Sequence, residues 1–302
     1  MRWTVGVLGA VATGLLSSHR SSLSVAIVSM AKYNSSATGA RDDSDEGQCW
    51  LQSGNHGNSS SQDDNPIIRG EFDWSESLQG IILGASFYAY LITPTIAGRI
   101  TERFGSKWVT AVSLTVPAIL LSLIPIAARL HVGALIVVLL IMGLFHGCIF
   151  TSLFSLFAHW FPTSERSIAV AGLAAVHNFG NVVTYPLAGY LCDLGVWPAV
   201  FYVISLAHIP WILFWLICVE NTPLISNTKG YMKCSDEELK YIDQNKGSFG
   251  APKKNSSAPW RSIFTSKCLW ATINAKVCAG WGYYMYLSKM PSYLDKADPS
   301  LR

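Results

Sequence analysis

Long apolar segments alternate with short polar ones along most of the chain. Before residue 220, six stretches are long enough to cross a hydrocarbon core of ~30 Å as helices. They cover approximately residues 5–30, 77–98, 109–128, 134–158, 168–191 and 199–219. A seventh, more polar stretch covers 269–289, and its glycines and tyrosines are typical of a helix that lines a cavity. The pattern predicts an all-α polytopic membrane protein with about seven transmembrane helices.

The first stretch has a polar centre, Ser17–Ser22, which includes His19 and Arg20. The basic start and the apolar run Val5–Leu16 also fit a cleaved signal peptide, so this alternative stays open. The apolar pattern resumes at Leu23, beyond what a signal peptide needs. That continuation favours a transmembrane helix.

Residues 32–73 form a polar loop with two glycosylation sequons, at Asn34 and Asn58. Eight carboxylates lie between Asp42 and Asp73. The acidic run within them lacks the glycine and the ligand spacing of a calcium loop. We therefore predict a flexible luminal or extracellular loop with both sequons glycosylated.

The polar segments predicted on the opposite side of the membrane from this loop are basic. The turn Gly98–Lys107 carries three cations and one carboxylate, and seven Lys and Arg residues lie between Lys229 and Arg261. Positive loops face the cytoplasm, so the amino terminus is predicted inside and a third sequon, at Asn255, unused. The predicted regions are a first helix (1–31), a glycosylated loop (32–74), helices 2 to 6 (75–219), a cytoplasmic central loop (220–266) and a seventh helix (267–302).

Composition agrees with a membrane protein. Half of the 302 residues are hydrophobic and only 14% are charged, against about 25% in soluble proteins. The net charge of +3 is too small to suggest nucleic acid as a partner. The seven cysteines have no metal-ligand spacing, and Cys49 with Cys192 is the one pair considered for a disulfide. No nucleophile elbow, phosphate loop or carboxylate pair is present, so we expect no enzyme, no cofactor and no metal.

The turn Gly98-Arg-Ile-Thr-Glu-Arg-Phe-Gly-Ser-Lys107 resembles the loop between helices 2 and 3 of major facilitator transporters, with Glu102 in place of the usual Asp. Gln79–Gly84 and Ser86–Tyr90 resemble the anion/cation symporter branch, which contains sialin, the vesicular glutamate transporters and the type I sodium/phosphate cotransporters. Trp160–Ser167 and Pro259–Ser266 also match loops of that branch.

The resemblance implies a major facilitator bundle, of which this chain contains the six-helix amino-terminal half and helix 7. It also implies a secondary active transporter of organic anions with proton or sodium as the coupling ion, working by alternating access in the lipid bilayer. The membrane would be lysosomal, vesicular or the plasma membrane. Two alternatives stay open: a transporter of inorganic phosphate or urate, and a truncated, non-transporting regulatory fragment.

The sequence departs from the branch at its chemistry. In helix 4, where the branch has an arginine and one or two glutamates, this chain has Leu139, Met142 and His146. Ala279 stands near the start of the seventh helix, where the glutamate transporters have an arginine. The coupling group therefore differs from that of the relatives.

Arg20 is the main candidate for the binding site. A mid-span arginine costs roughly 2.5–3.5 kcal/mol on insertion scales, so it usually faces a cavity or a partner, and the resemblance places it in the substrate cavity. Tyr88 and Tyr284 are further substrate-binding candidates, and packing explains both nearly as well. His146 is the candidate proton-coupling residue, with His19 and His177 as weaker rivals. The predicted gating motif consists of Gly98, Arg99, Glu102, Arg103, Gly105 and Lys107.

Overall fold

A computed structural model describes residues 1–31, 70–229, 234–245 and 265–297. The sequons at Asn34, Asn58 and Asn255 lie outside these residues, and so does Cys49. The described parts are helical. The helices are α1 (Arg2–Met30), α2 (Glu76–Phe104), α3 (Ser106–Leu130), α4 (Val132–Trp160), α5 (Thr163–Asp193), α6 (Trp197–Leu206), α7 (His208–Cys218), α8 (Pro223–Lys229), α9 (Asp236–Gln244) and α11 (Lys267–Ala297).

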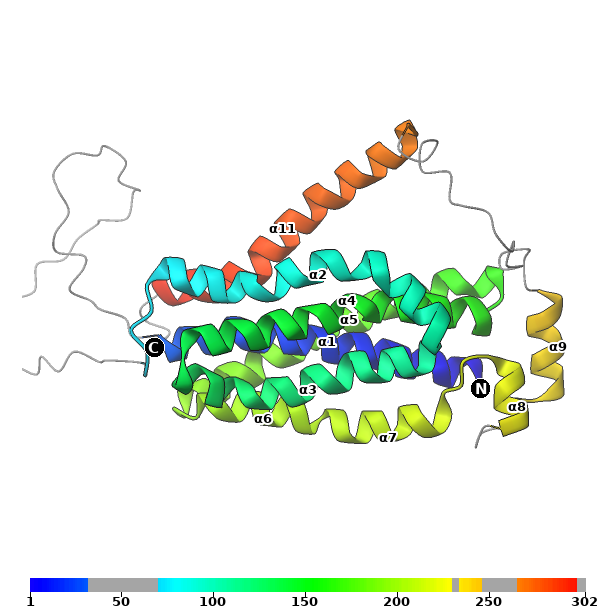
Figure 1. Cartoon of the computed structure of the whole chain (residues 1–302), viewed down its shortest axis with the longest axis horizontal. Coiled ribbons are helices and arrows are strands. Elements are labelled where there is room, and N and C mark those ends of the chain that lie inside the picture. The colour runs from blue at the N-terminus through cyan, green and yellow to red at the C-terminus, as the bar shows by residue number, and fades with distance from the viewer. Residues whose placement is uncertain (32–69, 230–233, 246–264, 298–302) are drawn as a thin grey trace, which may run out of the picture.

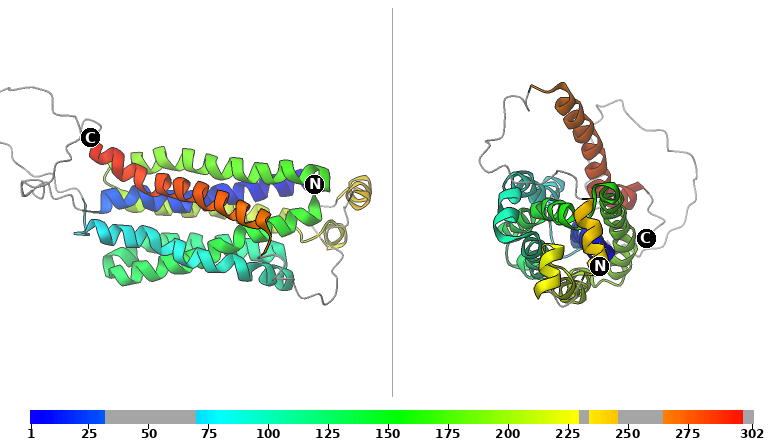
Figure 2. Two further views of the ribbon diagram at one scale, coloured as in Figure 1. Left: turned by 90° about the horizontal axis from the view of Figure 1, so that it is seen from above. Right: turned by 90° about the vertical axis from the view of Figure 1, so that its right-hand side faces the viewer.

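The long helices run side by side as one bundle, and α1 lies near its middle (Figures 1 and 2). The most extensive helix contacts join α1 to α5, α2 to α4 and α3 to α4. The short helices α8 and α9 lie at the end of the bundle that holds residue 1, called here the Met1 end. Helix α11 crosses one flank obliquely and contacts α1.

Five segments of the described chain are long and apolar enough to span a membrane. They are α2, α3, α4, α5 and the combined segment Trp197–Cys218. Helices α1 and α11 are as long, at 29 and 31 residues, but they are less apolar. The polar centre of α1 is one reason for its lower hydropathy. The packing of α1 inside the bundle favours a structural helix over a signal peptide.

The basic turn after the second span is shorter than the sequence pattern predicts. Helix α2 continues through Phe104, so Arg99, Glu102 and Arg103 lie in its last two turns. Only Gly105 connects α2 to α3, with φ at +85°, a conformation that favours glycine. A Cβ atom at Gly105 would also meet the side chain of Asn221 at 2.7 Å.

The sixth span is broken into α6 and α7 at Ala207. Pro210 explains the break, because it has no N–H group and its ring clashes with the carbonyl four residues earlier, that of Leu206. Helix α5, by contrast, continues through His177 and Pro186. The proline there is accommodated within one 31-residue helix.

The core consists of two main apolar clusters, one toward each end of the bundle. Helix α1 contributes Val5–Leu16 to one cluster and Leu23–Met30 to the other. Helix α4 contributes residues from Ile149 onward to the first of these clusters and residues up to Met142 to the second. Between the clusters lies a buried polar layer, which includes Ser17, His19, Ser21, Ser22, His146, Asn181 and His208.

Candidate functional site

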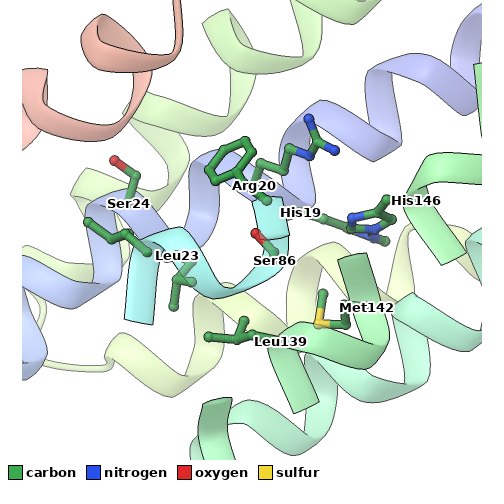
Figure 3. A pocket seen from close by; sticks show the side chains of 10 residues that line it. His19, Arg20, Leu23, Ser24, Ser86, Leu139, Met142 and His146 are labelled. Carbon is green, nitrogen blue, oxygen red and sulfur yellow. The ribbon is translucent and has the colours of Figure 1, made fainter. Parts of the chain in front are cut away.

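A cavity opens into the polar layer beside Arg20. The room inside it is small, about 20 Å³. Its lining comes from α1, α2 and α4: His19, Arg20, Leu23, Ser24, Leu83, Ser86, Phe87, Leu139, Met142 and His146. Figure 3 shows Arg20 and the two imidazoles on one side, with Leu139 and Met142 on the wall below them. The cavity is thus mainly apolar with a few polar groups, as small-molecule sites usually are.

The Arg20 side chain is held against two aromatic rings of α2. Its guanidinium carbon lies 4.4 Å from the ring centre of Tyr90 and 5.3 Å from that of Phe87. Such cation–π contacts stabilise a partly desolvated guanidinium. They also leave the position of the charge at the cavity wall well defined.

Of the two predicted tyrosines, Tyr88 does not line this cavity. Tyr88 is 68% exposed on another face of α2, because residues 87 and 90 share a helical face and residue 88 is turned about 100° from residue 87. The prediction for Tyr88 therefore does not hold for this cavity. Tyr284 lies in α11, and its side chain is outside the described part of the chain.

His146 meets a second histidine directly. Its Nε2 atom lies 3.1 Å from Nδ1 of His19, which is a hydrogen-bonding distance. The ring of His208, on α7, lies 4.6 Å from the ring of His19, centre to centre. Three imidazoles from three helices thus form one buried cluster, each at most 4% exposed. His208 was missed at the sequence level, although a polar residue in the middle of a predicted span was available as a signal.

A second polar connection links α1 to the flanking helix α11. The Ser21 hydroxyl donates to Oδ1 of Asn181 at 2.5 Å, and Nδ2 of Asn181 donates to the Tyr283 hydroxyl at 3.0 Å. Asn181 was not singled out from the sequence, and Tyr283 was noted only as one of the tyrosines of the seventh stretch. His177, the weaker rival for proton coupling, lies apart, with Nδ1 3.0 Å from the carbonyl oxygen of Thr13 and its ring edge-on to Phe150.

The predicted gating motif is only partly assembled in the described structure. Lys107 forms a 2.8 Å ion pair with Glu220, and its backbone N–H donates to Asn221. Arg99, Glu102 and Arg103 are exposed and take part in none of the ion pairs found among the described residues. A Cβ atom added at Gly98 would meet no other atom of the described residues within 4 Å. Lys107 and Gly105 therefore hold the α2–α3 junction to the end of α7, and the charged residues of α2 do not.

A second contact at the Met1 end anchors α9. The Glu238 carboxylate accepts from the backbone N–H of Arg2 at 2.9 Å and lies 3.2 Å from the terminal amino group. The Arg2 guanidinium pairs with Glu165 of α5 and lies over the ring of Tyr241. These contacts connect the central loop to the first turns of α1 and α5.

Among the described residues, no group of three or more His, Cys, Asp or Glu side chains is arranged to hold a metal ion. The cysteines described there, including Cys192, are all free thiols. The polar layer therefore offers protonation and hydrogen bonding as its chemistry.

Comparisons with known proteins agree with this architecture. The family model of the Major Facilitator Superfamily matches residues 64–301. Vesicular glutamate transporter 1 of Xenopus laevis is 32% identical over 76% of this chain and 40% of its own length. The uncharacterized transporter slc-17.2 of Caenorhabditis elegans is 30% identical over 91% of this chain and 54% of its own length. The chain thus spans about half the length of these relatives or less.

A solved structure shows the same fold. The inward-open conformation of the xylose transporter XylE from E. coli superposes with a TM-score of 0.51 at 13% identity, covering 83% of this chain and 57% of XylE. The bundle, the family match and the branch of its relatives lead to one conclusion. This chain is a multi-pass, all-α membrane protein that belongs to the Major Facilitator Superfamily, related to its vesicular glutamate transporter and slc-17 branch.

Proposed function

We propose that the chain forms part of a secondary active transporter of organic anions, coupled to a proton gradient and working by alternating access. The observation that carries this proposal is the position of Arg20, a permanent cation at the wall of a mainly apolar cavity in the middle of the bundle. A guanidinium binds a carboxylate through two parallel hydrogen bonds, which favours a carboxylic acid as the substrate.

The relatives support an anionic substrate. Several are named as vesicular glutamate transporters, and glutamate carries carboxylates that a guanidinium can bind. The slc-17.2 protein is named only as a transporter, and the likeness to XylE concerns the fold alone. The particular acid is left to experiment.

The composition of the spans favours proton over sodium as the coupling ion. Hard cations are bound by oxygen ligands, among which carboxylates are prominent. In α1 to α7, every Asp and Glu lies in the first or last turns of its helix: Glu76, Glu102, Glu165 and Asp193. The titratable groups at the cavity are instead His19 and His146. A histidine can exchange a proton in the pH range of a vesicle.

We place the Met1 end in the cytoplasm, following the positive-inside rule. Arg99, Arg103, Lys107 and Arg166 lie at the helix ends on that side. Glu71 of the first loop lies at the opposite end, where it pairs with Arg129. The membrane would be that of a lysosome or vesicle, or the plasma membrane.

The test is uptake of labelled L-glutamate, sialic acid, phosphate and urate into vesicles from cells that express the gene from genomic DNA, so that any further coding sequence is included. We expect saturable uptake of an organic acid that increases with a pH gradient and is unchanged when potassium replaces sodium. Uptake of phosphate or urate alone would support the corresponding alternative substrate. A correctly inserted protein that transports no anion, but changes uptake by a co-expressed relative, would support the regulatory fragment instead.

A further inference from the structure

The three buried histidines have more hydrogen-bonding groups than the surrounding protein uses. A neutral imidazole has one donor and one acceptor nitrogen. The contact between His19 Nδ1 and His146 Nε2 uses one nitrogen of each ring. Among the described residues, no protein group hydrogen-bonds to the second nitrogens, Nε2 of His19 and Nδ1 of His146. Both rings line the cavity, so these nitrogens can bind a proton, a water molecule or a ligand from it.

The third ring has a defined orientation. Nδ1 of His208 lies 3.3 Å from the carbonyl oxygen of Ile204, one turn earlier in the chain. Because a carbonyl can only accept, this contact favours the tautomer with the proton on Nδ1. Nε2 of His208 is then a lone-pair acceptor, again without a partner among the described residues. Its ring packs against His19, so His19 on α1 contacts both His146 on α4 and His208 on α7.

The charged and titratable groups around the cluster are neutral or cationic. Arg20 follows His19 on α1 and lines the same cavity, and α2 presents Tyr90 to Arg20. Helix α5 contributes His177, which contacts Thr13, nearly two turns of α1 before His19. The charged residues of α3, Lys107 and Arg129, lie at the two ends of that helix. A second positive charge beside Arg20 is therefore unfavourable until an anion enters the cavity.

We propose that His19, His146 and His208 act as one proton-binding unit, in which a single proton is shared across the His19–His146 contact. His208 is a positioning residue that holds the ring of His19 and limits the cluster to one added charge. The proposal rests on the proposed function in one respect: the proton and an anion at Arg20 stabilise each other. By thermodynamic linkage, the bound proton then raises the affinity for the anion, and the bound anion raises the affinity for the proton. Proton and anion would therefore be transported in the same direction.

The test uses the 302-residue chain with ¹⁵N-labelled histidine, purified in lipid nanodiscs and titrated by NMR. We expect scalar coupling between the two facing ring nitrogens and a joint titration of His19 and His146 in which the pair takes up one proton. The apparent midpoints of two interacting groups belong to the pair and not to either group. Replacing the ring that packs against the pair, as in His208→Gln, should therefore move the shared midpoint by about one pH unit. His177→Gln is the matched control and should leave it unchanged.

The wild-type spectra alone can overturn the proposal. Independent titration of His19 and His146, without coupling between their nitrogens, would contradict a shared proton whether or not any variant folds. A shared midpoint that His208→Gln leaves unchanged in a folded protein would remove His208 from the unit. Addition of 10 mM L-glutamate, as about a thousand-fold excess over protein, tests the link to the anion and should raise the midpoint. Joint titration with no response to glutamate, sialic acid or phosphate would keep the proton unit and contradict its linkage to an anion at Arg20.

Discussion

At the residue scale, the proposed binding site depends most on Arg20. A charge inside a span makes membrane insertion of that span harder. Two aromatic rings of α2 contact the Arg20 guanidinium. A guanidinium also has a planar fork of N–H donors, whose geometry suits a carboxylate.

Replacing Arg20 separates a binding role from a structural one. Arg20→Lys keeps the charge but loses the two parallel hydrogen bonds, so we expect a rise in KM of roughly 10- to 100-fold, which corresponds to about 1.5–3 kcal/mol for a charged hydrogen bond. Arg20→Ala should abolish uptake while the protein remains inserted, because removal of a mid-span charge makes insertion easier. Uptake and surface amount are measured on the same cells.

A structural role predicts a different outcome for these two variants. Both would then reduce the amount of folded protein at its membrane, since a buried partner would be left without its hydrogen bond. Normal uptake by Arg20→Ala at normal surface amount would exclude Arg20 from the binding site.

At the scale of elements, close helix approach gives the cavity its walls. Helices α2 and α4 meet at Gly143, where an added Cβ would collide with the backbone carbonyl of Ser86. Small residues at such crossings allow helices in a membrane to pack closely. The same contact positions Ser86 and Met142 on facing walls of the cavity beside Arg20.

Helix α9 depends on one carboxylate for its docking. Burial opposes the ionisation of Glu238, but hydrogen bonds from the Arg2 N–H and the Cys234 thiol and the nearby amino group outweigh it, so the pKa of Glu238 is lowered. A group whose folded-state pKa is depressed stabilises the docked state above its unfolded pKa, and this stabilisation is lost as the pH falls through the folded pKa.

We therefore expect α9 to detach at acid pH. After correction for the intrinsic pH dependence of amide exchange, residues 236–244 should be strongly protected from hydrogen–deuterium exchange at pH 7 and weakly protected at a pH below the normal glutamate range. Glu238→Gln should show the weak protection already at pH 7, and Glu237→Gln, at an exposed neighbouring position, should behave as wild type. Equal exchange in wild type and Glu238→Gln at pH 7 would show that other contacts hold the helix.

At the scale of the whole molecule, the bundle has chemically different ends. The Met1 end combines the Lys107–Glu220 and Arg2–Glu165 ion pairs with α8 and α9. At the opposite end, Arg129 pairs with Glu71 and lies over the ring of Trp197, next to the stacked rings of Phe72 and Trp74. These contacts hold the last part of the first loop against the bundle.

The predicted orientation places the first loop outside the cytoplasm. Glycosidase treatment of the protein from a glycosylating cell should therefore increase its gel mobility, and Asn34→Gln with Asn58→Gln should abolish the change. Asn255→Gln alone should have no effect, because that sequon is predicted on the cytoplasmic side. An unchanged mobility of the wild type would contradict the orientation.

The sequence by itself determined the class of the protein. Apolar runs of twenty or so residues can satisfy their backbone hydrogen bonds in a bilayer only as helices, so the spans follow from composition along the chain. Arg20 and His146 were also identifiable, because polar groups inside spans are costly and rare. The glycine at position 105 marked the α2–α3 junction, although the helical extent of Arg99–Phe104 did not follow from its charge pattern.

The tertiary structure decided which of these groups meet. His208 joins His19 and His146 only because α7 packs beside α1, and no local pattern contains that contact. Tyr90 and Tyr88 have the same chemistry in the sequence, and the rotation of α2 against α1 places Tyr90 against Arg20 and leaves Tyr88 exposed. Lys107 likewise pairs with Glu220, 113 residues later, because α3 begins and α7 ends at the same side of the bundle. Local propensity and hydropathy define each helix, whereas packing between helices distant in the chain sets their rotation and thereby the site.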